Sequence, residues 1–128
     1  MRAYPLAVWP GQWAICRLSA DSDVPSWALA TGRLVSVTRT ATELSIVAPE
    51  ACVPAAVLAE RDFRVIEVVG PVPFSVVGLI AAITRPLAEA GVSVLTLATY
   101  DTDYVLVREA SLEVAVRVLS EAGFLITA

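Results

Sequence analysis

The residue types that could grip a polar ligand gather in one short segment between two apolar stretches. Residues 99–103, Thr-Tyr-Asp-Thr-Asp, bring two carboxylates and three hydroxyl groups together. The flanking residues 92–98 and 104–107 are mostly aliphatic and are predicted strands. A carboxylate and a hydroxyl at a strand end can receive an ammonium group, so this segment, the Asp corner, is a candidate site. Asp and Thr are also ordinary turn formers, and a plain turn is the alternative interpretation.

A second candidate is the segment that leads into a predicted helix. Residues 70–78, with the sequence GPVPFSVVG, follow a β-branched strand at 65–69 and are called the helix-start loop. Ser75 is expected to cap a helix that runs to about Ala90. Backbone N–H groups at a helix start lack intrahelical partners and suit a carboxylate. A simple strand-to-helix connection is the alternative interpretation.

Together the two segments predict a more specific site. In a strand-helix-strand-strand topology, the start of the first helix and the end of the second strand can lie at the same edge of the sheet. N–H donors would then bind a carboxylate while Asp103 binds an ammonium group. Those two groups are what every free α-amino acid carries, so the pairing predicts an amino-acid site.

The elements that must position this site repeat one pattern. The second half predicts the order strand, helix, strand, strand, helix, strand, with strands at 65–69, 92–98, 104–107 and 124–126 and helices at 75–90 and 111–123. The first half repeats it less clearly, with strands at 13–18, 34–39 and 44–47, a short helix or turn within 21–30 and a short helix at 51–59.

The expected fold is therefore α+β, with two ferredoxin-like βαββαβ units. The first unit is expected at residues 1–62 and the second at 63–128, each an antiparallel sheet with helices on one face. Residues 63–69 are expected to serve both units, and residues 4–8 to add an edge strand.

Composition removes several classes of function. The 128 residues are 57% hydrophobic, which supports a buried core, and they include no His, Lys or Asn. Imidazole bases, lysine nucleophiles and histidine zinc sites are therefore excluded. All nine basic residues are dispersed Arg in a chain of net charge −4, which is unsuited to nucleic acid. No carboxylate pair or metal-ligand spacing is evident, so we expect no enzyme activity, cofactor or metal.

Cysteine use and hydropathy predict a cytoplasmic protein. Cys16 and Cys52 are far apart in the sequence and are expected to be reduced. The N-terminus lacks the apolar run of a signal peptide. The charge-free residues 68–84 contain Gly70 and two prolines and are too short to span a bilayer.

These residues resemble the ACT domain family, small βαββαβ regulatory modules that bind amino acids. The likeness is closer to short bacterial proteins of two ACT units and to either half of the eukaryotic CASTOR arginine sensors. The matching phrases run through most of the chain: SVTRT at 36–40, ELSIV at 43–47, Phe74-Ser75 with Gly78, Pro86-Leu87-Ala88, Ser93, and TYDTDYVLV at 99–107.

The resemblance implies a ligand between paired C-terminal units, which in this chain requires a homodimer. Gly78 and the loop before it would meet the carboxylate, while Thr99, Tyr100 and Asp103 would meet the amino group and flank the side chain. Ser93 and Val94 would come from the neighbouring unit. The implied ligand-binding set is Pro73, Phe74, Val76, Gly78, Ile80, Ser93, Val94, Thr99, Tyr100 and Asp103.

One departure from the resemblance concerns the ligand. The arginine sensors carry an acidic residue two positions before the matching Gly, where this chain has Val76. Arginine is therefore disfavoured, and an uncharged or apolar side chain is favoured slightly. The expected function is a non-enzymatic amino-acid sensor acting on an unidentified protein target, without nucleic-acid or membrane partners. The alternative is a protein-interaction module that binds no small molecule.

Overall fold

The computed structural model describes residues 4–29 and 33–128, which form two compact units. Residues 11–63 make the N-terminal unit, and residues 4–10 with 64–128 make the C-terminal unit. The boundary lies inside strand β5 (Ala59–Val68), so one strand contributes to both units. This division differs from the expected 1–62 and 63–128 because residues 4–10 belong to the C-terminal unit.

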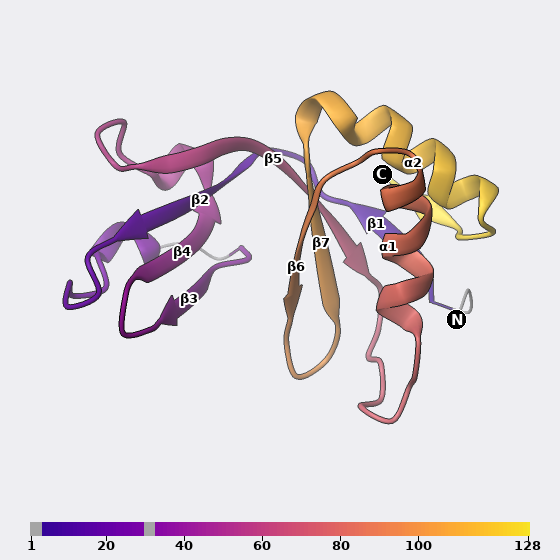
Figure 1. Cartoon of the computed structure of the whole chain (residues 1–128), viewed down its shortest axis with the longest axis horizontal. Helices are drawn as coiled ribbons and strands as arrows, with labels where there is room; N and C mark the ends of the chain where they lie inside the picture. The colour runs from indigo at the N-terminus through magenta and orange to yellow at the C-terminus, as the bar shows by residue number, and fades with distance from the viewer. Residues whose placement is uncertain (1–3, 30–32) are drawn as a thin grey trace. The chain divides into compact units, whose positions relative to one another are not determined.

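The C-terminal unit has the element order strand, helix, strand, strand, helix, strand (Figure 1). Its elements after β5 are α1 (Leu79–Glu89), β6 (Val94–Ala98), β7 (Asp103–Arg108), α2 (Leu112–Glu121) and β8 (Ile126–Thr127). A further strand, β1 (Leu6–Val8), lies between β8 and β5, and β7 pairs with both β5 and β6.

Strand β1 corrects two expectations. It pairs antiparallel with β5 and parallel with β8, so the sheet is not wholly antiparallel and β1 is not an edge strand. The physical reason is burial: Leu6 and Val8 lie in the same apolar cluster as the helices, and both edges of the strand find backbone partners.

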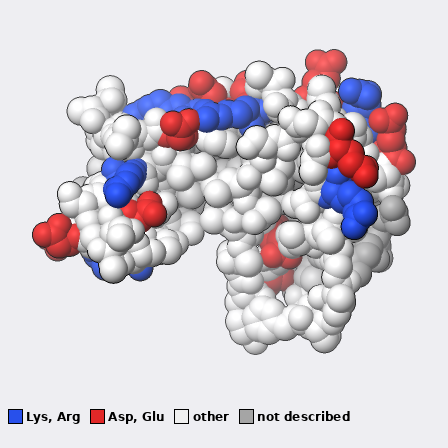
Figure 2. Space-filling view, in the orientation of Figure 1, with Lys and Arg blue, Asp and Glu red and all other residues white. Residues whose placement is uncertain are grey.

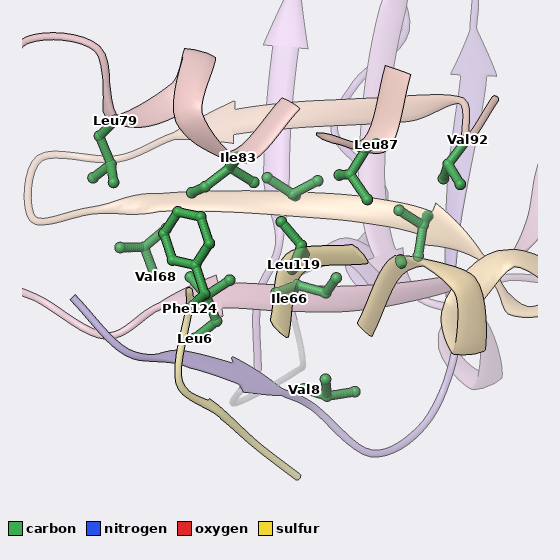
Figure 3. Close-up of a cluster of buried hydrophobic side chains, with 13 residues drawn as sticks. Leu6, Val8, Ile66, Val68, Leu79, Ile83, Leu87, Val92, Leu119 and Phe124 are labelled. Carbon is green, nitrogen blue, oxygen red and sulfur yellow. The ribbon is translucent and has the colours of Figure 1, made fainter. Parts of the chain in front are cut away.

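Both helices of the C-terminal unit cover one face of the sheet. Figure 3 shows Leu79, Ile83 and Leu87 in a row along α1, pointing toward the strands. They recur every four residues and are all buried, as one face of an amphipathic helix requires. The same cluster contains buried Ala115 and Leu119 from α2 and alternate residues of β1, β5 and β7. This shared core fixes where α1 begins relative to the strand ends.

Helix α1 begins four residues later than predicted. Its N-cap is Gly78, whose φ of 83° lies in the left-handed region and cannot continue a helix toward earlier residues. The preceding residues form a turn in which the Val76 N–H donates to the Pro73 carbonyl, 3.1 Å. Ser75 therefore caps nothing. Ser111 does stand at the N-cap of α2, but without a side-chain cap hydrogen bond.

The N-terminal unit is a sheet with short 3-10 turns. Its elements are β2 (Trp13–Leu18), a turn at Ser26–Ala28, β3 (Ser36–Arg39), β4 (Leu44–Pro49), a turn at Glu50–Cys52 and the first part of β5. Neighbouring strands in the order β3-β4-β2-β5 are antiparallel. Within its described residues the unit has no α-helix, so the helix predicted at 51–59 is wrong. Pro54 holds Val53 extended, with a ψ of 121°, and the turn cannot propagate.

Neither α1 nor α2, nor any other helix in residues 4–29 and 33–128, has the length and apolar character needed to cross a bilayer. In the same residues, no three or more Cys, Asp or Glu side chains are grouped where they could hold a metal ion.

Replacing Leu87 by alanine tests the shared core. Leu87 is fully buried between α1 and the sheet, so L87A should lower the free energy of unfolding by about 2–5 kcal/mol. L125A is the matched control, since Leu125 is largely exposed and should cost about 0.5 kcal/mol or less. Urea unfolding followed by circular dichroism measures both. Equal losses would contradict the assigned core.

Candidate functional site

The helix-start loop and the Asp corner line an open cavity of about 460 Å³. Figure 1 shows the two segments side by side at one end of the C-terminal unit. Eight residues of the expected ligand-binding set line it: Pro73, Phe74, Val76, Gly78, Ile80, Thr99, Tyr100 and Asp103. The structure therefore brings together the two segments that the sequence analysis paired.

Five further residues line the cavity and were not in the expected set: Val72, Leu79, Ala81, Ala98 and Thr102. One signal could have found Ala98. It pairs with Asp103 across the hairpin of β6 and β7, and directly opposed residues share one face of a sheet. The other four residues could be identified only from the observed start of α1 and the observed path of the two loops.

Ser93 and Val94 lie elsewhere. They precede or begin β6, whereas Ala98 at the other end of that strand lines the cavity. The expectation that they contact a ligand held by a second copy stays a prediction.

One hydrogen bond joins the helix-start loop to the Asp corner, and a second joins the Asp corner to the end of β5. The Val72 N–H donates to the Asp101 carbonyl, 2.7 Å, and the Thr102 hydroxyl donates to the Val68 carbonyl, 2.5 Å. Gly70 lies at this contact, where a Cβ atom would stand 2.8 Å from the Val72 nitrogen and 3.2 Å from the Asp101 oxygen. The close approach of the two segments therefore requires glycine at position 70.

The Asp corner is a hydrogen-bonded turn in its own right. The Thr99 N–H donates to the Thr102 carbonyl, 2.8 Å, and the Thr102 N–H donates to the Thr99 hydroxyl, 3.3 Å. Thr102 is only 7% exposed. The plain-turn interpretation therefore applies to Thr99 and Thr102, whose hydrogen bonds close the turn.

Asp103 differs from the threonines because its carboxylate is not used in the fold. Among the described residues this carboxylate has no hydrogen bond or ion pair, and Asp103 is half-buried on the cavity wall. It is an acceptor that faces an open space with its charge uncompensated. Such a group is suited to a cationic ligand atom.

The start of α1 supplies the opposite polarity. The first helical hydrogen bond runs from the Ala82 N–H to the Gly78 carbonyl, 2.9 Å, so the N–H groups of residues 79–81, in the first turn of α1, have no helical partner. The N-cap has no side-chain cap hydrogen bond, and the first turn contains no acidic residue. Because Gly78, Leu79 and Ile80 line the cavity, this positive helix end borders the same space as Asp103.

Two aromatic rings stand at the cavity wall on opposite loops. Phe74 and Tyr100 pack edge to face, with ring centroids 5.0 Å apart and planes at 71°. Yet Phe74 is 76% exposed and Tyr100 is 81% exposed. Most of each ring therefore remains able to contact another molecule.

Asp101, the other carboxylate of the Asp corner, lies near the Tyr104 phenol. Burial raises the pKa of the Tyr104 phenol, and the nearby Glu67 and Asp101 carboxylates raise this pKa further. Trp9 packs edge to face on Tyr104 at 5.7 Å and donates from Nε1 to Glu67, 2.9 Å. Since successive strand residues point to opposite faces, Tyr104 lies away from Asp103. Asp103 lines the main cavity, and Asp101 does not.

Replacing Gly70 by alanine tests the junction of the two segments. The added methyl group must displace Val72 or Asp101 backbone, so G70A should lower the free energy of unfolding by about 1–3 kcal/mol. It should also speed hydrogen exchange at the Val72 amide. G91A is the control, because Gly91 has a φ of 75° but nothing within 4 Å of its Cβ position. It should be destabilising through backbone strain while Val72 keeps its protection; unchanged protection in G70A would refute the junction.

Comparisons with known proteins assign the family. A family model described as ACT domain matches residues 58–121, and a second model, for an N-terminal domain, matches residues 11–56. No curated protein matches the sequence significantly. The likeness to the CASTOR sensors stays a prediction.

Solved structures extend the likeness over the whole chain. A crystal structure of a protein from Agobacterium tumefaciens is 32% identical, with a TM-score of 0.91, over 98% of this chain and 93% of that one. A protein of unknown function from Vibrio cholerae, described as a possible transport protein, is 23% identical, with a TM-score of 0.76, over 94% and 91%. The regulatory subunit of aspartate kinase from Thermus flavus shares the fold at 14% identity, with a TM-score of 0.65, over 92% and 96%. With the matched family model and the βαββαβ order of the C-terminal unit, these findings show that this chain belongs to the ACT domain family.

Proposed function

We propose that this protein is a non-enzymatic regulator that binds a free amino acid in the cavity of its C-terminal unit and acts as a homodimer. One observation carries the proposal: the unpaired Asp103 carboxylate and the uncapped start of α1 border the same space. An α-amino acid presents an ammonium group and a carboxylate on adjacent atoms. The two ends of this cavity have the complementary charges.

Each end of the amino acid has a stated partner in this proposal. The ligand carboxylate accepts hydrogen bonds from the N–H groups of the first turn of α1, where the helix dipole also favours negative charge. The ligand ammonium group pairs with Asp103, whose position beside Ala98 places it on the cavity side of the hairpin. Asp101 has no part in binding because it does not line this cavity.

We propose further that the N-terminal unit is a reduced ACT unit. Its sheet order β3-β4-β2-β5 places the second strand beside the third, the third beside the first and the first beside the fourth. The C-terminal unit has this order as well, except that β1 is inserted between its first and fourth strands. The 3-10 turns of the N-terminal unit occupy the positions of the two helices.

The homodimer is supported by the two expected site residues that do not line the cavity of their own chain. Ser93 and Val94 lie at the far end of β6 and do not line the cavity of their own chain. In the proposed dimer they complete the cavity of the second copy. The exposed Phe74, Val77 and Tyr100 side chains around the helix-start loop and the Asp corner support burial against another surface. A ligand held between two copies would favour the paired state and so regulate an unidentified protein target in the cytoplasm.

Substitution of Asp103 tests the ligand site. The purified protein should show a rise in melting temperature with at least one of the twenty amino acids, because a ligand that binds only the native state stabilises it. D103N should weaken that binding by about tenfold or more through loss of the charge-assisted bond. D101N, in the same turn, should bind like the parent protein. Titration calorimetry measures all three proteins.

Two results would refute this assignment. If no amino acid stabilises ligand-free protein, the protein-interaction module becomes the better account of the exposed rings. If D101N and D103N weaken binding equally, Asp103 contributes only to the overall negative charge of the Asp corner and does not pair directly with the ligand ammonium group.

Substitution of Ser93 tests the dimer. Ser93 is exposed and outside its own cavity, so S93R should leave the monomer fold intact. It should nevertheless reduce dimer formation in sedimentation velocity and weaken amino-acid binding by about tenfold. S120R, on the exposed surface of α2, is the matched control and should change neither. Normal binding by a monomeric S93R protein would contradict the shared site.

A further inference from the structure

We infer that the cavity selects amino acids with an apolar aliphatic or aromatic side chain over charged and small polar ones. This inference rests on the proposed function and names the class of ligand for that site. It follows from what lines the cavity beyond the groups that bind the two charged ends.

Charge is the first argument. Among the thirteen lining residues Asp103 alone is charged, and no Arg is among them. Once Asp103 pairs with the ligand ammonium group, an added lysine or arginine side chain finds no second carboxylate among the residues that line this cavity, since Asp101 lines the adjoining hollow instead. An aspartate or glutamate side chain likewise finds no cation. Bringing an unpaired charge out of water is strongly unfavourable, so charged side chains are rejected.

Two of the three hydroxyl groups on the cavity wall, those of the threonines, supply the second argument; the third is that of the exposed Tyr100. The Thr99 hydroxyl donates to the Thr102 carbonyl, 3.2 Å, and accepts from the Thr102 N–H. The Thr102 hydroxyl donates to the Val68 carbonyl. Both hydroxyls are therefore engaged in holding the Asp corner closed. A polar ligand side chain would have to compete with the bonds that form the cavity.

The apolar wall is the third argument. The remaining wall is formed by Val72, Val76 and Leu79 together with the Phe74 and Tyr100 rings. On the face visible in Figure 2, the end of the C-terminal unit that carries the two loops is mostly white, with one red acidic patch and no blue Lys or Arg atoms. Covering the two exposed rings with an apolar side chain removes apolar surface from water, which favours binding in proportion to the area covered.

Pairs of amino acids of equal shape give the sharpest test. Titration calorimetry at neutral pH with the full chain should give a valine affinity about tenfold above that of threonine, which adds only a hydroxyl. Norleucine should bind about a hundredfold more tightly than lysine, which has a similar aliphatic chain ending in an ammonium group. Leucine, methionine and phenylalanine should bind in preference to aspartate and glutamate.

The outcomes separate the two proposals. Tight binding of lysine, arginine, aspartate or glutamate, or equal affinities for valine and threonine, would overturn this inference and leave the amino-acid site standing. Absence of binding by every amino acid would overturn the proposed function and this inference with it.

A pair of variants assigns the selectivity to the wall. F74A should weaken leucine binding by about tenfold and alanine binding little, because only the longer side chain reaches the ring. L125A is the matched control: Leu125 is 66% exposed and does not line the cavity. It should change neither affinity. Equal losses for leucine and alanine in F74A would overturn the role of the ring in selecting the side chain.

Discussion

The contact between the helix-start loop and the Asp corner determines most of what this protein can do. It is made by the hydrogen bond from the Val72 N–H to the Asp101 carbonyl, and the neighbouring bond from the Thr102 hydroxyl to the Val68 carbonyl ties the corner to β5. The first bond fixes the helix-start loop beside the Asp corner, and the second fixes the corner beside β5. With them, a positive helix end and an unpaired carboxylate share one cavity. This close approach requires glycine at position 70, because a larger residue would place a Cβ atom against the backbone of Val72 and Asp101.

The contact depends in turn on the core beneath it. Leu79, Ile83 and Leu87 hold α1 on the sheet, and Val105 and Val107 of β7 belong to the same cluster. This packing determines where along the sheet α1 begins relative to the ends of the strands. Strand β1 widens the sheet, because Leu6 and Val8 add to the same apolar layer (Figure 3). The site is therefore placed by helices and strands, and its charged groups lie on the segments that these elements position.

Local sequence predicted the strands well because period-two alternation and β-branched residues are local signals. Trp13–Leu18 was predicted with its observed bounds, and the strands around the Asp corner were found within a few residues. The start of α1 was misplaced because apolar periodicity continues through Val76, while the left-handed Gly78 is a backbone property. The helix expected at 51–59 failed because Pro54 outweighed the helix propensity of the alanines.

The sequence by itself determined which chemical groups exist for binding: one turn with two carboxylates, one helix start without an acidic cap, no lysine and no histidine. It also determined the order of strands and helices, since hydrophobic periodicity is a local property. Only the tertiary structure decided that Asp103 lines the cavity while Asp101 does not, and that Thr99 and Thr102 close the turn. The reason is that a side chain's role depends on strand register and on contacts across the sheet, which neighbouring residues in the sequence do not specify.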